Sequence, residues 1–173
     1  MMAEDVCFET AQAEWAPVIG HFILEFATVE EFVHQVLTWY LRKTHLRESD
    51  IELVSKTRLN LFERIMLERL TNPKQRKSLT KAVAGIHNLR PTRNLLAHNA
   101  LGLEFARHVN GDFKMIGIVV SDVRRNDKSI DLATLKTRLA TVISHRKALS
   151  DVMSVFYRET MPNLEGENAE ADA

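Results

Sequence analysis

Hydrophobic side chains recur every three or four residues along most of the chain, which is the spacing of amphipathic helices. The spacing predicts a short helix over about 4–15, longer ones over about 17–43, 49–70 and 73–98, and a last one over about 131–157. Pro91 stands inside the 73–98 segment and predicts a kink or a break near residues 88–90. In the 17–43 helix the repeating positions are Phe22, Phe26, Val29, Val33, Val36, Leu37 and Tyr40.

The residues at several segment ends are those that favour helix ends. Asn72 followed by Pro73 predicts a helix start, because asparagine caps well and proline fits the first helical position. Pro17 is equally well placed in a first turn. Asp131, or alternatively Ser129, is expected to cap the last helix. The helices are therefore expected to be joined by short connections.

After residue 100 the pattern changes from helical to strand-like. Residues 101–109 and 113–120 flank Asn110 and Gly111, a pair that favours the tight turn of a β-hairpin. Together the segments predict an all-α fold, a four- to five-helix up-down bundle with a β-hairpin insertion before the last helix. We expect one bundle domain over residues 1–160 and an acidic disordered tail over 161–173.

Several large apolar residues of the 17–43 helix fall outside the stripe that is expected to face the core. They are Leu24, Phe32, Trp39 and Leu41. Spare apolar surface of this kind often marks a partner interface. We therefore expect a homodimer.

The charges of the chain are balanced in number but uneven in position. The sequence has 23 Lys and Arg residues and 23 Asp and Glu residues, a formal net charge of zero. Residues 1–40 contain seven acids and no Lys or Arg, whereas residues 56–98 contain ten bases and two acids. A local basic zone can attract a polyanion such as RNA, although a solvated helix face has the same composition.

The cysteine count, the hydropathy and the histidine spacing argue against disulfide-bonded, membrane-spanning and metal-binding proteins. Cys7 is the only cysteine, which excludes an internal disulfide and favours a reducing, cytoplasmic location. No uninterrupted apolar run reaches the ~18 residues that span a bilayer, so no membrane contact is expected. The histidines lack a metal-ligand spacing and no glycine-rich phosphate loop is present, so we expect no metal and no cofactor.

The residues best suited to chemistry lie at the end of the 73–98 segment, in the sequence RNLLAH. Asn94 and His98 are four residues apart, so they share a helix face and the amide can orient the imidazole. Arg93 falls within an apolar stripe, where a guanidinium is costly unless a carboxylate or a phosphate meets it. Arg93, Asn94 and His98 are therefore the candidate catalytic residues.

Three further residues are candidates for a supporting role. Glu30 lies at the edge of the apolar face of its helix, and we hypothesise that it pairs with Arg93 and holds it toward a cleft. His87 extends the face of Asn94 and His98 by further turns if the helix survives Pro91. Arg90 belongs to the same basic segment.

The Arg-Asn-x-x-Ala-His sequence at the end of a bundle helix resembles the signature of HEPN domains, at residue level in this hexapeptide alone. Members that cut RNA are metal-independent dimers in which two Arg/His pairs line one cleft. The resemblance implies that His98 moves protons at the ribose 2′-hydroxyl or the leaving oxygen, and that Arg93 stabilises the charged transition state. Asn94 would orient His98, and the products would carry a 2′,3′-cyclic phosphate.

The same resemblance implies a toxin or an antiviral or stress effector, with an antitoxin or a nucleotidyltransferase as a partner. HEPN pairs with nucleotidyltransferase antitoxins use a tyrosine two residues after the histidine, where this chain has Ala100, so that switch is not supported.

Two alternatives to an endoribonuclease remain. One is a catalytically inactive, dimeric HEPN-like module that binds RNA, a nucleotide or a protein. The other is a plain helical interaction protein, in which Arg93 cross-links helices through Glu30 and His98 caps a helix end.

Overall fold

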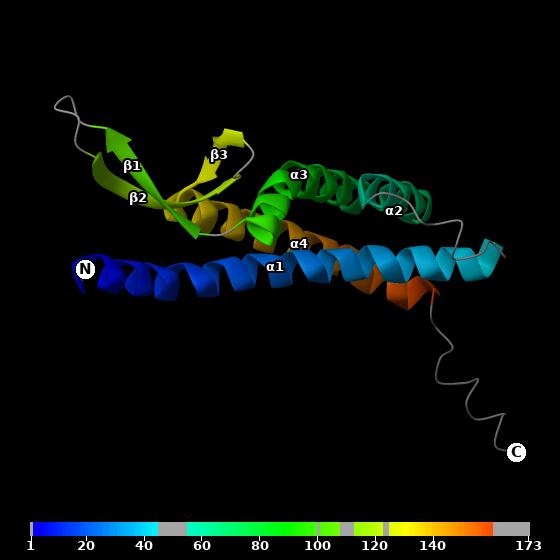
Figure 1. Ribbon diagram of the computed structural model, residues 1–173. Helices are drawn as coiled ribbons and strands as arrows, with labels where there is room; N and C mark the ends of the chain where they lie inside the picture. Colours follow the sequence, from blue (N-terminus) through cyan, green and yellow to red (C-terminus); the bar gives the residue numbers. More distant parts are fainter. Residues whose placement is uncertain (1, 45–54, 100, 108–112, 123–124, 161–173) are drawn as a thin grey trace, which may run out of the picture. The chain divides into compact units, whose positions relative to one another are not determined.

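The computed structural model describes residues 2–44, 55–99, 101–107, 113–122 and 125–160. Within them the chain is mostly helical, and a three-stranded antiparallel sheet is inserted before the last helix, which confirms the expected fold class (Figure 1). The elements are α1 (Met2–Thr44), α2 (Ser55–Arg69), α3 (Pro73–His98), β1 (Leu101–Arg107), β2 (Phe113–Asp122), β3 (Arg125–Ile130) and α4 (Leu132–Thr160).

Helix α1 is one continuous helix, so the expected separation into a short and a long helix at Pro17 is wrong. Proline lacks the N–H that would bond to the carbonyl four residues earlier, which here belongs to Ala13. Both Ala13 and Pro17 are exposed. Water can therefore serve the unpaired carbonyl, and the helix tolerates the proline.

Helix α3 likewise continues through Pro91, so a break near residues 88–90 does not occur, and the alternative expectation of a kink there stays a prediction. Its start is the predicted one: the backbone N–H of Lys74 donates to Asn72 Oδ1 at 2.9 Å, with Pro73 at the first helical position. The start of α4 is also as predicted, because the N–H of Thr134 donates to Asp131 Oδ1 at 2.7 Å. Local side-chain capping thus fixes where both helices begin.

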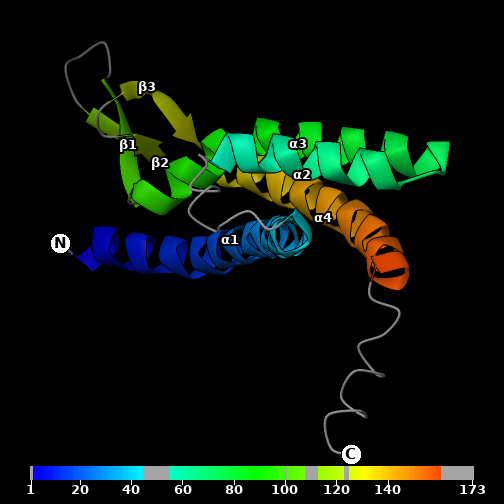
Figure 2. The ribbon, with the colours of Figure 1, turned by 90° about the vertical axis from the view of Figure 1, so that its right-hand side faces the viewer.

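The three strands form an antiparallel sheet in the order β1-β2-β3 (Figure 2). Strands β1 and β2 make the expected hairpin, and its predicted turn at residues 110–111 lies outside the described residues. Strand β3 was not expected from the sequence. It pairs Ile130 with Val120 and Ser129 with Ser121. The described residues also exclude the predicted start of the second long helix and the 161–173 tail.

The chain divides into two compact units, each built from two separate segments of the sequence. Unit 1 comprises Met1–Ala27 and Asn88–Ile143, and unit 2 comprises Thr28–His87 and Ser144–Ala173. Buried residues of unit 1 include Trp15, Phe22, Phe26, Leu89, Leu96, Val120, Leu135 and Val142. Buried residues of unit 2 include Val36, Leu37, Phe62, Met66, Leu79, Ile86, Leu149 and Met153.

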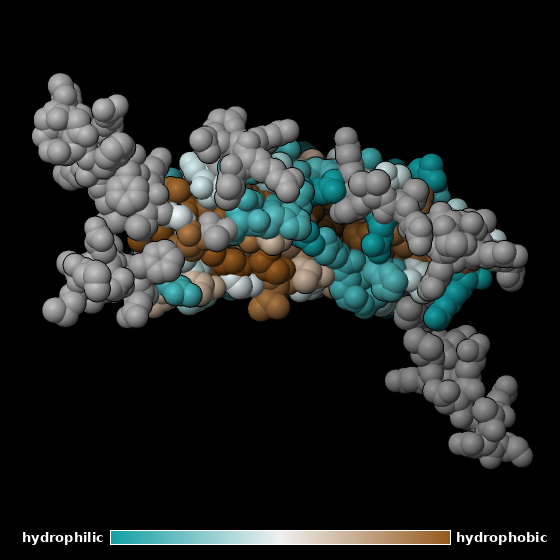
Figure 3. Space-filling model, viewed as in Figure 1, coloured by the Kyte–Doolittle hydropathy of each residue, from teal (hydrophilic) through white to brown (hydrophobic). Residues whose placement is uncertain are grey.

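The apolar residues of α1 that were expected to face outward differ in their exposure. Leu24 is 68% exposed, and Phe32 and Trp39 are half-buried. Leu41 is only 5% exposed, so its expected outward position is wrong. It lies one turn after buried Leu37 and so extends the same stripe. On the face shown in Figure 3, hydrophobic residues are visible between hydrophilic ones.

Candidate functional site

The three candidate catalytic residues lie in the last two turns of α3, within unit 1. Asn94 and His98 are exposed, and His98 is the last residue of the helix. Arg93 is half-buried, between the buried residues Leu89 and Leu96. The structure therefore offers an imidazole and an amide to solvent, with a guanidinium at the edge of the apolar core.

The amide of Asn94 does not hold the imidazole of His98. Within the described parts of the chain, neither of these two side chains has a hydrogen-bond or ion-pair partner. Arg93, in contrast, is not without an interaction partner in the protein. The amide of the next residue, Asn99, donates to the carbonyl of Leu95 at 2.9 Å and closes the end of the helix. The polar groups of Asn94 and His98 are thus available to a ligand.

A second arginine, Arg138 of α4, contacts the same part of α3. Its Nη1 donates to the hydroxyl of Thr92, which is 1% exposed and immediately precedes Arg93. Arg138 is half-buried, and among the described residues it meets no carboxylate. A hydroxyl does not neutralise a guanidinium, so the positive charge of Arg138 can still attract an anion.

The helical spacing within α4 does not single out Arg138. Its contact with Thr92 joins residues that are 46 positions apart, and no local pattern reports such a contact. The one available signal was that Thr92 and Leu96 lie four residues apart, so that the hydroxyl falls within a buried stripe and needs a partner.

The supporting residues are distributed over both units. Glu30 of α1 is exposed and lies in unit 2, so its pairing with Arg93 stays a prediction. His87 is half-buried in unit 2, where its Nε2 is 2.8 Å from Asn60 Oδ1 of α2. This hydrogen bond ties α3 to α2, which lie side by side in Figures 1 and 2. Arg90 is half-buried in unit 1.

The basic segment places its charges on the surface of unit 2. Six of its side chains are exposed, namely Arg64, Arg69, Lys74, Arg76, Lys77 and Lys81. None of the six has an ion pair with a carboxylate in the described ranges. The basic zone read from the sequence is therefore an exposed and uncompensated one.

In the part of the chain that the structure describes, no three His, Cys, Asp or Glu side chains gather where they could hold a metal ion. Among the same residues, no helix has the length and apolar character required to cross a membrane.

Comparison with known proteins gives no relative for this chain. No family model, no curated protein and no solved structure matches it.

Proposed function

We propose that this protein is a HEPN-type, metal-independent endoribonuclease that works as a homodimer in the cytoplasm, as a toxin or an antiviral or stress effector. Support comes from one observation above all. The end of α3 combines two solvent-facing groups, the amide of Asn94 and the imidazole of His98, with the half-buried guanidinium groups of Arg93 and Arg138. Arginine at a core edge is suited to phosphate, and an exposed imidazole can exchange protons with an RNA backbone.

The proposed reaction needs no group beyond those of RNA and the protein. The ribose 2′-oxygen attacks the adjacent phosphorus, and the bond from phosphorus to the 5′-oxygen breaks. His98 removes the 2′-hydroxyl proton or gives a proton to the leaving 5′-oxygen. Arg93 stabilises the negative charge that builds on the phosphoryl oxygens. The products are a 2′,3′-cyclic phosphate and a 5′-hydroxyl end.

A homodimer would bring two copies of the α3 end to one cleft, so that one imidazole acts as base and the other as acid. Among the described residues, the exposed Leu24 of α1 is the large apolar side chain available for such an interface.

A catalytically inactive RNA-binding module is the second candidate function. It is favoured by the lack of any described hydrogen-bond partner for His98, because an imidazole that acts as a base is usually oriented by a second group. In that case the guanidinium groups of Arg93 and Arg138 would retain RNA without cutting it.

The deciding experiment incubates labelled RNA with the protein in the presence of EDTA. The wild type is compared with His98→Ala and Arg93→Ala, and with His34→Ala, an exposed histidine of α1, as the matched control. We expect cutting that survives EDTA, falls by a factor of about 100 or more in His98→Ala and Arg93→Ala, and persists in the control.

Cutting that stops with EDTA, or that continues in His98→Ala, contradicts the proposal. RNA retention without cutting identifies the binding module, and no effect on RNA in any variant leaves only the plain interaction protein. Circular dichroism of each variant establishes that the helices are intact.

A further inference from the structure

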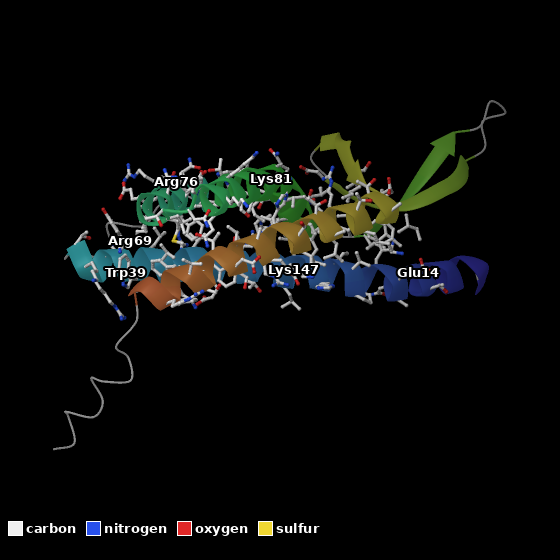
Figure 4. The ribbon with its side chains drawn as sticks, turned by 180° about the vertical axis from the view of Figure 1, so that it is seen from behind. Glu14, Trp39, Arg69, Arg76, Lys81 and Lys147 are labelled. Atoms are coloured by element: carbon white, nitrogen blue, oxygen red, sulfur yellow. The ribbon has the colours of Figure 1, made fainter. Side chains whose placement is uncertain are left out.

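The indole ring of Trp39, near the end of α1, is contacted by two cations. The guanidinium carbon of Arg69 on α2 lies 4.2 Å from the ring centroid, and Lys43 Nζ lies 5.3 Å from it. Figure 4 shows Trp39 and Arg69 close together in unit 2. Both distances are within the range of cation–π contacts, so the ring and the two charges form one cluster.

The same ring also packs against an aromatic side chain of α4. Phe156 of α4 is buried and meets Trp39 edge to face, with ring centroids 5.2 Å apart and planes at 84°. The neighbouring Tyr157 donates its hydroxyl proton to Gln35 Oε1 on α1. These contacts attach α4 to α1 at the indole and one helical turn before it. Trp39 is therefore a rigid platform that remains half-exposed.

A third cation extends the cluster. Arg76, in the first turns of α3, donates from Nη1 to the carbonyls of Leu67 and Leu70, which flank Arg69 on the sequence. Its charge therefore lies beside the end of α2 that carries Arg69. Within the described ranges, none of Lys43, Arg69 and Arg76 forms an ion pair with a carboxylate. Positive charge thus accumulates around one fixed aromatic ring.

We propose that Trp39, Arg69, Lys43 and Arg76 form a binding site for single-stranded RNA. One base stacks on the Trp39–Arg69 pair, and neighbouring phosphates contact Lys43 and Arg76. Proteins hold single strands in this way, by stacking unpaired bases on aromatic rings or guanidinium planes and by neutralising the backbone. The choice of RNA rests on the proposed function, whereas the stacking site rests on the contacts around Trp39.

The same cluster is poorly suited to an anionic membrane. Membrane-surface binding needs large apolar side chains beside the cations. Among the described residues, the exposed large hydrophobic side chain is Leu24, which belongs to unit 1. The cluster instead offers a planar stack and charge, which match a nucleobase with its phosphates.

Tryptophan fluorescence provides a direct test. The chain has two tryptophans, and Trp15 is 2% exposed, so Trp15→Phe leaves Trp39 as the only reporter. His98→Ala is added so that the RNA stays intact. We expect an unlabelled oligouridylate to quench Trp39, and Arg69→Gln to weaken binding by about fivefold or more. Arg64→Gln on the same helix is the matched control, with an effect of no more than about twofold.

Two comparisons make the proposal refutable even if a variant at Trp39 does not fold. Arg69→Lys keeps the charge and loses the planar group, so oligouridylate binding equal to that of the parent protein would overturn the stacking. Equal quenching by heparin or by duplex RNA would overturn it too, and a response to phosphatidylglycerol vesicles alone would identify a membrane site. Quenching by oligouridylate together with a failure to cut RNA would refute the nuclease and leave this site standing.

Discussion

The imidazole of His145 on α4 occupies the space that a side chain at Gly85 of α3 would need. Three of its ring atoms, Nε2, Cδ2 and Cε1, lie closer to the Cβ position of Gly85 than van der Waals contact permits. Glycine inside a helix costs about 0.5–1 kcal/mol relative to alanine. The contact with His145 explains why alanine does not take this position.

The first prediction concerns this pair of residues. Gly85→Ala should lower the free energy of unfolding by about 1 kcal/mol, because an overpacking cost of ~1–3 kcal/mol exceeds the gain in helix propensity. In a His145→Ala background the same change should raise stability by up to ~1 kcal/mol, because the space is then free. Urea unfolding of the four proteins measures both effects. An effect of the same sign in both backgrounds would contradict the packing argument.

The second prediction concerns pH. Burial lowers the pKa of His145 below its ordinary value of 6.5, and the positive charge of Lys81 lowers this pKa further. The unfolded chain therefore takes up a proton at a higher pH than the folded protein. The contribution of neutral His145 to the free energy of unfolding is therefore complete above about pH 6.5. It is lost as the pH falls from there through the pKa of His145 in the folded protein. In urea unfolding at several pH values, His145→Gln should make the free energy of unfolding nearly independent of pH just below 6.5. Lys81→Gln should make its decrease with falling pH smaller.

The third prediction concerns the cap of α4. Asp131 accepts hydrogen bonds from the N–H and the hydroxyl of Thr134, which lower its pKa from the ordinary 3.8. Asp131→Ala should lower the melting temperature, and Asp131→Asn should retain most of it. The stabilisation by the carboxylate should be lost as the pH falls below its ordinary pKa. Asp151→Ala, at an exposed mid-helix aspartate, is the control and should not lower the melting temperature.

The fourth prediction separates the structural role of Arg138 from a role in RNA binding. Arg138→Gln should raise the KM for RNA cleavage, because it removes a guanidinium from the α3 end. Thr92→Val breaks the hydrogen bond between Arg138 and Thr92 but keeps the charge of Arg138. It should therefore lower the free energy of unfolding by about 1–3 kcal/mol and leave the KM nearly unchanged. Steady-state kinetics and urea unfolding of both variants decide the matter. Equal effects of the two changes on KM would reduce Arg138 to a structural residue.

The fifth prediction concerns the homodimer. Light scattering after size exclusion should give twice the chain mass of 19.8 kDa at micromolar concentration. Leu24→Glu should weaken the dimer by about tenfold or more, because it places a charge on the most exposed large apolar side chain among the described ones of α1. A mass of one chain for the wild type at that concentration would remove the shared cleft from the proposed mechanism.

The local spacing of apolar residues and the capping residues were sufficient to predict most of the fold. The apolar residues that recur at helical spacing from Phe22 to Leu37 are buried, and the caps at Asn72 and Asp131 form as predicted. The helix separation expected at Pro17 was wrong because the cost of a proline depends on whether the unpaired carbonyl can reach water, which a sequence does not state. Strand β3 was missed because Arg125–Ile130 has little strand character of its own. Its pairing is provided by the free edge of β2.

The position of the candidate residues on a helix could be predicted from the sequence, whereas their contacts with other helices could not. The place of Arg93, Asn94 and His98 at a helix end followed from helical spacing alone. The contact between Arg138 and Thr92, and that between His87 and Asn60, depend on how helices distant in sequence pack. No periodicity within one helix carries that information. The predicted pairing of Glu30 with Arg93 is of the same kind and awaits a double-mutant cycle.

Because both compact units draw on separated stretches of the chain, no truncation at one point releases either of them whole. Within unit 1 the segment that follows residues 1–27 begins at Asn88, so during synthesis the N-terminal stretch leaves the ribosome long before the rest of its unit exists. Its apolar side chains, Trp15 and Phe22 among them, which are buried in the folded protein, therefore remain exposed to solvent or bound by a chaperone until the unit is complete. Nascent-chain arrest at successive lengths should therefore show protease resistance in the 1–27 stretch only once residue 143 has emerged.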